Sequence, residues 1–93
     1  MNKKFILTLS TTVMLSMMVP ALAKMSSQSY KLYNSAIAQE QAGNYQQALE
    51  YVKKALVYSP DDAILNIKIA GLYENLNQTK EAINAYKKAI SLR

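Results

Sequence analysis

Small and apolar residues along the chain follow the three-to-four-residue spacing of amphipathic helices, and this pattern itself repeats every 34 residues. Ala48 and Ala55 return as Ala82 and Ala89, with similar neighbours around them. A fixed period of this length is typical of stacked helix–turn–helix units, because each unit buries its apolar face only against a neighbour. The pattern therefore predicts an all-α fold of two tandem units with antiparallel helices. An ordinary four-helix bundle with coincidental spacing is the alternative.

Capping and turn residues mark the ends of the predicted helices, which span about residues 27–42, 44–58, 61–76 and 80–93. Gly43 supplies the left-handed residue that ends the first helix. Asn44 is expected to cap the second helix, with Gln47 three residues later in a capping-box arrangement. Pro60 ends that helix, because a proline forces the residue before it out of the α region.

Residues 1–23 have the pattern of a secretory signal peptide. Lys3 and Lys4 form a positive start, an apolar stretch follows, and Ala21 and Ala23 place small residues where a signal peptidase reads them. We therefore expect this segment to be removed on export, which leaves a periplasmic or secreted protein. An uncleaved membrane anchor is the alternative, but the apolar stretch is hydroxyl-rich and shorter than the roughly 20 residues of a spanning helix.

Charge and composition exclude several classes of function. Without Lys3 and Lys4, nine basic residues against six acidic ones give a net charge of +3, too small to indicate nucleic-acid binding. The chain has no histidine and no cysteine, so the commonest general base and the thiol nucleophile are both missing. The adjacent Asp61 and Asp62 follow a proline at a helix start, where carboxylates act as caps. We predict no enzyme activity, no metal site and no cofactor.

The repeated positions resemble the tetratricopeptide repeat, a helical hairpin with small residues at fixed places. The matching positions are Ala36, Ala48, Ala55 and Pro60 in a first unit of about residues 29–62, and Ala70, Ala82 and Ala89 in a second of about 63–93. The resemblance covers the domain 24–93. It implies a short right-handed α-solenoid that acts by binding other proteins.

The first unit departs from the family's pattern more than the second. Ser35 and Gln39 replace core residues in its first helix, so we expect that helix to act as a partly polar cap. The family usually has an aromatic residue early in the first helix of each unit. Leu32 stands at that position in the first unit, and Asn66 stands there in the second.

The resemblance implies a binding surface on the concave side, formed by the first helix of each unit. This surface comprises Tyr30, Tyr33, Asn34, Ile37, Glu40 and Gln41 from the first unit, and Ile64, Ile67, Lys68, Gly71, Glu74 and Asn75 from the second. An apolar centre with a polar rim is typical of protein-binding patches. The alternative is that Tyr30 and Tyr33 only cover the end of a small domain. Some members clamp a peptide carboxylate with lysine and asparagine, but Tyr33 and Ile37 stand at those positions in the first unit.

Two further surfaces follow from the repeat. Ile83, Tyr86 and Ile90 on the last helix are positions that another repeat would cover, so they form a candidate assembly face for a second copy or a larger protein. The lysine pairs 53–54 and 87–88 lie toward the convex side, where they are expected to keep the protein soluble. An anionic surface is an alternative partner for these lysines, and contact with a membrane surface is not expected.

These observations predict an exported adaptor that binds a peptide or helix of another protein on the concave face. The alternative is a self-assembling subunit, such as a homodimer, or a complex-completing subunit, that uses the last helix.

Overall fold

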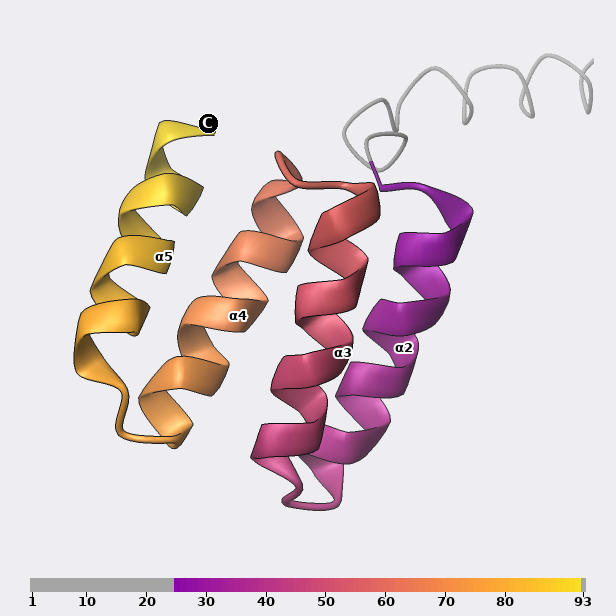
Figure 1. Ribbon diagram of the computed structural model, residues 1–93, viewed down its shortest axis with the longest axis horizontal. Helices are drawn as coiled ribbons and strands as arrows, with labels where there is room; N and C mark the ends of the chain where they lie inside the picture. The colour runs from indigo at the N-terminus through magenta and orange to yellow at the C-terminus, as the bar shows by residue number, and fades with distance from the viewer. Residues whose placement is uncertain (1–24, 93) are drawn as a thin grey trace, which may run out of the picture.

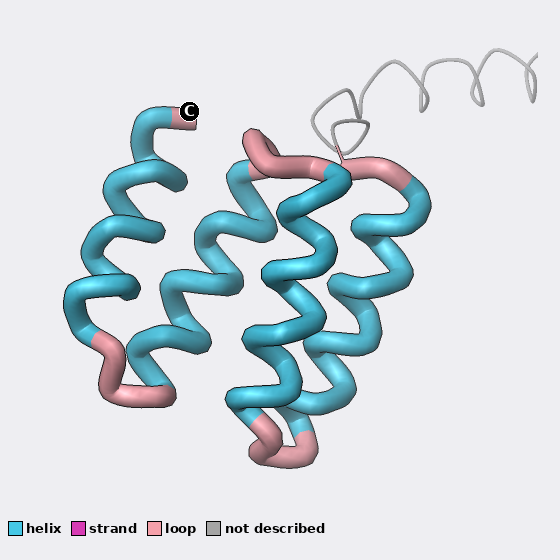
Figure 2. The backbone as a smooth tube through the Cα atoms, viewed as in Figure 1, coloured by secondary structure: helices cyan, strands magenta, loops and turns pink. Residues whose placement is uncertain are grey.

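The computed structural model describes residues 25–92, which form four α-helices and no strand. The helices are α2 (Ser27–Gln41), α3 (Tyr45–Tyr58), α4 (Ala63–Asn75) and α5 (Thr79–Ser91). They lie side by side in chain order (Figure 1), each packed against the next, with short turns between them (Figure 2). The predicted all-α fold of two helix–turn–helix units is confirmed. The predicted signal peptide lies outside the described residues.

The two hairpin turns adopt the same backbone conformation with different residues. Gly43 ends the first hairpin's leading helix with φ of 83°, and Asn77, one repeat later, has φ of 59°. Both values lie in the left-handed region, which glycine enters freely and asparagine enters more readily than other residues. The two units therefore turn alike although only the first has the expected glycine.

Side chains cap two of the four described helices. Ser26 Oγ accepts a hydrogen bond from the Ser29 N–H at 3.1 Å at the start of α2. Asp62 Oδ1 accepts from the Leu65 N–H at 2.9 Å at the start of α4. Each bond satisfies a backbone donor that has no partner within its helix.

The capping box predicted at the start of α3 is wrong. Asn44 precedes the helix, but with φ of −89° and ψ of 70° its backbone is not in the extended region where a cap residue normally sits. Its side chain forms no capping hydrogen bond, and Nδ2 instead donates to Gln39 Oε1 at 3.0 Å. The last predicted helix also begins one residue earlier than expected, at Thr79.

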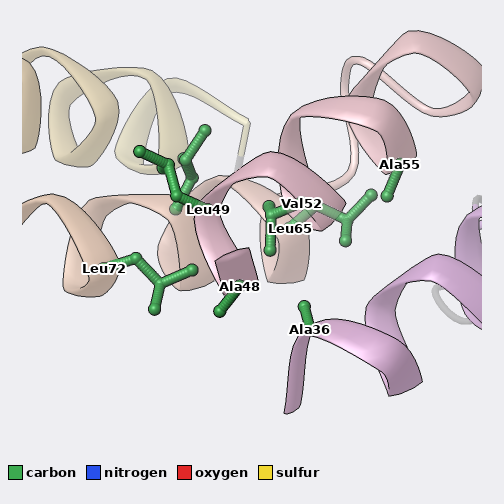
Figure 3. Packing of buried hydrophobic residues seen from close by; sticks show 8 residues of the cluster. Ala36, Ala48, Leu49, Val52, Ala55, Leu65 and Leu72 are labelled. Carbon is green, nitrogen blue, oxygen red and sulfur yellow. The ribbon is translucent and has the colours of Figure 1, made fainter. Parts of the chain in front are cut away.

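Alanines let the paired helices approach, and larger side chains fill the space between the units. Ala36 on α2 and Ala48 on α3 are completely buried where these helices meet. Leu49, Leu65 and Leu72 join the same buried cluster from α3 and α4 (Figure 3). Full burial of a leucine side chain contributes roughly 1.5–3 kcal/mol, so this cluster is the main source of stability.

A buried serine cluster ties the start of α2 to the end of α3. Ser29 is completely buried, and its Oγ lies 2.8 Å from both the Ala55 carbonyl oxygen and Ser59 Oγ. The Ser26 N–H also donates to Ser59 Oγ, at 3.0 Å. One repeat later the place of Ser29 is taken by Ala63, so the described part of the second unit has no counterpart to this cluster.

Asn66, which departs from the family's aromatic residue, has a structural role of its own. Its side chain is buried, and Nδ2 donates to the carbonyl oxygens of Pro60 at 3.2 Å and Asp62 at 2.7 Å. A buried amide with partners stabilises the loop that it contacts. Asn66 therefore fixes the connection between the two units instead of filling the core.

Candidate functional site

An open groove crosses the first helices of both units and reaches α5, with a volume of about 380 Å³. We call it the α2–α4 groove. Its lining residues are Tyr33 and Glu40 from α2, Ile64, Ile67, Lys68 and Gly71 from α4, and Tyr86 from α5. Side chains far apart in the sequence thus meet around one groove.

The apolar wall of this groove exists because α4 carries apolar residues on two opposite sides. Leu65, Ile69 and Leu72 point into the core and are buried. Ile64 and Ile67, on the other side, are 38% and 49% exposed. The core does not need these two isoleucines, so they are available for contact with another molecule.

An ion pair joins the two first helices across the groove. Lys68 Nζ on α4 lies 2.7 Å from Glu40 Oε1 on α2. The two side chains are only 25% and 26% exposed, so solvent screens their attraction less than it would on an open surface. One of the three donors of the Lys68 ammonium is therefore already used within the protein.

Tyr86 forms the wall that the groove shares with α5. Its hydroxyl donates a hydrogen bond to Glu74 Oε1 on α4. This hydrogen bond is the main cause that raises the pKa of Tyr86, followed by partial desolvation and the negative charge of Glu74. The bond ties the side chain to α4, and Tyr86 lines both the α2–α4 groove and a smaller hollow whose other lining residues include Ile83, Ala82 and Glu74.

Tyr86 also lines a second groove, which we call the α4–α5 groove. It is lined by Ile67, Tyr86, Ala89 and Ile90. Ile67 and Tyr86 therefore line both grooves. The predicted concave face and the predicted assembly face meet at these two side chains.

The residues predicted for the concave face fall into two groups. Tyr33, Glu40, Ile64, Ile67, Lys68 and Gly71 line the α2–α4 groove. Tyr30, Asn34, Ile37, Gln41, Glu74 and Asn75 lie on the same two helices but are not among its lining residues. Their part in binding stays a prediction.

Tyr86 is the groove residue that sequence reasoning assigned only to the assembly face. It lies on a second helix, and only the first helices were expected to line the concave side. The acceptor of its hydroxyl, Glu74, lies on the preceding helix α4. A carboxylate on that helix is the feature of the sequence that could have placed Tyr86 beside α4.

The assembly face on α5 is exposed among the described residues. Ile83, Tyr86 and Ile90 are 48%, 37% and 69% exposed. One repeat earlier, Leu49 and Val52 are almost completely buried against α4.

Residues 25–92 contain no group of three or more histidine, cysteine, aspartate or glutamate residues that could hold a metal ion. None of the helices in this part of the chain is long and apolar enough to cross a membrane.

The sequence profile described as Tetratricopeptide repeat matches residues 31–91, and the paired helices with alanine contacts agree with it. The chain belongs to the tetratricopeptide-repeat family. Such repeats generally form non-catalytic arrays that bind other proteins on extended concave surfaces.

Three proteins resemble this tetratricopeptide-repeat chain. The uncharacterized protein ycf37 of Cyanophora paradoxa is 43% identical over 63 residues, which is 63% of this chain and 35% of that protein. The protein O-mannosyl-transferase TMTC3 of Homo sapiens is 37% identical over 70 residues, or 74% of this chain and 8% of the transferase. The TPR repeat-containing protein MJ0263 of Methanocaldococcus jannaschii is 42% identical over 48 residues, or 52% of this chain and 15% of that protein. The chain thus spans a minor part of each relative.

Proposed function

We propose that this chain is a non-enzymatic adaptor that holds a segment of another protein in the α2–α4 groove. The observation that supports the proposal is the convergence of exposed Ile64 and Ile67 with Tyr33 and Tyr86 around one open groove. Exposed apolar side chains rimmed by polar groups are typical of a surface that binds protein. The transferase among the relatives is matched over 8% of its length, so its activity is not carried over.

The partners of the charged groups define the chemistry of the bound segment. Lys68 is paired with Glu40, and Glu74 accepts from Tyr86. The groove therefore recognises a segment mainly through apolar side chains, with hydrogen bonds at the rim. A short extended peptide or an amphipathic helix with aliphatic residues fits this description.

A peptide library selected against the chain tests the proposal directly. We expect selected peptides to be rich in aliphatic residues, and their binding is then measured by calorimetry. The double variant Ile64→Gln with Ile67→Gln should weaken binding by at least about tenfold, because two desolvated contacts are lost. Both side chains are partly exposed, so helix content should not change.

Val57 provides the matched control, since it is an apolar residue of α3 that is 78% exposed and lines neither groove. Val57→Gln should bind the selected peptides like the original chain. Equal binding by the double variant, with circular dichroism unchanged, would contradict the proposed site.

Export belongs to the same proposal. It is supported by the positive start, the apolar stretch and the small residues Ala21 and Ala23. The mass and N-terminal sequence of the protein from an exporting host should show a chain that begins at Lys24. A chain that keeps residues 1–23 and stays with the cytoplasmic fraction would contradict export.

A second candidate function uses the assembly face on α5, for self-assembly or for completing a larger complex. It is favoured by the exposure of Ile83, Tyr86 and Ile90 at positions whose counterparts in the first unit are covered. Charging one of these side chains should dissociate such an assembly, and an unchanged molecular mass would count against this second candidate.

A further inference from the structure

A hollow of about 300 Å³ lies where α4 ends and α5 begins, and it adjoins the α2–α4 groove. We call it the Glu74 hollow. Its lining residues are Glu74, Asn77, Thr79, Ala82, Ile83 and Tyr86. Tyr86 also lines the α2–α4 groove, so a segment held in that groove can place a neighbouring side chain in the hollow.

The lining of the Glu74 hollow suits a long basic side chain. Ala82, Ile83 and the ring of Tyr86 offer apolar surface, and Glu74 carries the only charge among the six lining residues. Lysine and arginine have an apolar stem and a charged end, so one side chain can use both parts of this lining. An acidic side chain would instead be repelled by Glu74.

The carboxylate of Glu74 is held in place and keeps free acceptor positions. Its Oε1 accepts the hydrogen bond from the Tyr86 hydroxyl. Because an ionised carboxylate has about four acceptor positions on its two oxygens, most of them remain. The side chain is exposed, and within residues 25–92 no lysine or arginine forms an ion pair with it. Glu74 therefore presents an oriented and accessible negative charge.

The first unit shows which group meets the glutamate at the equivalent position. A shift of 34 residues places Glu74 on Glu40. Glu40 Oε1 lies 2.7 Å from Nζ of Lys68, which reaches it from another helix across the groove. The same position thus binds an ammonium group in the first unit, and it has none in the described part of the second.

The start of α5 offers the hollow a weaker charge of opposite sign. No side chain caps this helix, so its first N–H groups form a positive end. This end amounts to about half an elementary charge, and Glu81 in the first turn offsets part of it. The full charge of the Glu74 carboxylate outweighs it, so the hollow favours a cation.

We propose that the segment bound in the α2–α4 groove carries a basic residue beside its aliphatic residues, and that Glu74 binds the charged end of this residue. The inference rests on the proposed function and adds the charge of the partner to it. Ile64 and Ile67 supply the apolar contacts of the segment. Glu74 and Tyr86 select among aliphatic segments those that have a lysine or arginine at the right place.

Peptides selected from a random library on the protein produced from the full sequence test this inference. We expect lysine or arginine to be enriched beside the aliphatic residues. In one selected peptide, replacing the basic residue by glutamine should weaken binding about three- to fivefold, the effect of an exposed ion pair. The same replacement should have no effect with Glu74→Gln, which removes the charge but keeps an oxygen that can accept from Tyr86. The loss of this difference assigns the contact to Glu74.

Glu81→Gln is the matched control, because it removes the same charge from an exposed residue of α5 that does not line the hollow. It should distinguish the two peptides as the original chain does. Glu74→Lys should reverse the preference, so that a peptide with glutamate at this place binds better than one with lysine. Circular dichroism checks that the three variants keep their helix content.

Salt gives a second readout of the same contact. The advantage of the basic peptide over its glutamine version should shrink between about 0.1 and 1 M salt, because salt screens exposed charges. An advantage that does not change with salt would overturn the ion pair with Glu74.

The outcome for the peptides separates this inference from the proposed function. Peptides that bind without a preference for a basic residue, or that keep the preference with Glu74→Gln, would overturn the inference and leave the proposed function standing. A chain that selects no peptide would contradict the proposed function itself, and the inference with it.

Discussion

Helices α3 and α5 occupy the same place in their repeats, but their outer faces have opposite surroundings. On α3, Leu49 and Val52 are 2% and 0% exposed because α4 packs over them. On α5, Ile83 and Tyr86 at the same positions are 48% and 37% exposed. Both helices have an apolar stripe, so an apolar stripe in the sequence does not show whether another helix packs over it. Where a helix does so, as on α3, the apolar residues stabilise the fold. Where none does among the described residues, as on α5, they are available for binding.

The largest expected difference is between Leu49→Ala and Ile83→Ala. Leu49→Ala leaves a cavity under α4 and should lower the free energy of unfolding by about 2–4 kcal/mol. Ile83→Ala should cost less than about 1 kcal/mol in the monomer, because its side chain is half exposed. Urea unfolding followed by circular dichroism, at concentrations where the chain is monomeric, measures both. Equal losses would show that α5 is covered in solution even in the monomer.

The serine cluster sharpens the comparison, since only the first unit shows it in the described residues. Ser29→Ala removes the hydroxyl that lies between the Ala55 carbonyl and Ser59 Oγ. We expect a loss of about 1–2 kcal/mol, because the remaining buried groups lose a partner. Ala63→Ser, the equivalent position in the second unit, should give no comparable gain. The same unfolding measurement applies, and an unchanged stability of Ser29→Ala would show that the cluster is not a stabilising contact.

A smaller difference is expected between the turns that precede α3 and α5. Gly43→Ala places a side chain on a residue with φ of 83° and should cost about 1 kcal/mol, although the Cβ would meet no neighbour. Asn77→Gly relieves the same conformation in the second turn and should raise the stability by a smaller amount. Thermal unfolding of the two variants checks the signs. A stabilising Gly43→Ala would show that the left-handed turn relaxes without cost.

The smallest expected effect is the pH dependence of the stability that comes from the ionisation of Tyr86. Its counterpart on α3 is Val52, which does not ionise. The fold raises the pKa of Tyr86, so this group contributes stability below the unfolded pKa of about 10. That contribution is lost as the pH rises through the higher folded pKa. The difference in tyrosinate absorbance between the original chain and Tyr86→Phe gives the titration of this residue. In Glu74→Gln it should titrate at lower pH, and an unchanged titration would exclude Glu74 as the cause.

Local signals made the helices and turns predictable. Gly43, Pro60 and the acidic residues after it act within a few residues of themselves, so their effects follow from the sequence alone. The failed capping box at Asn44 shows the limit of such signals, because the same side chain found Gln39 at the end of the preceding helix. A cap competes with every other partner within reach.

Contacts between distant residues were not predictable in the same way. Ser29 meets Ser59 across 30 residues, and Lys68 meets Glu40 across 28. Both pairs depend on how the helices stack. The repeat pattern predicts which face of a helix a residue lies on, but not which residue of the next helix it contacts. Tyr86 belongs to the groove because α5 brings it beside α4, and a rule that assigns binding to first helices alone omits it.

The outer faces of α2 and α5 differ in polarity. Lys31 and Ser35 make the face of α2 partly polar, whereas Ile83 and Ile90 leave an apolar surface on α5. For protein engineering, this difference makes α5 the better helix on which to place a designed repeat. A repeat placed against α2 would first require Lys31 and Ser35 to be replaced by aliphatic residues.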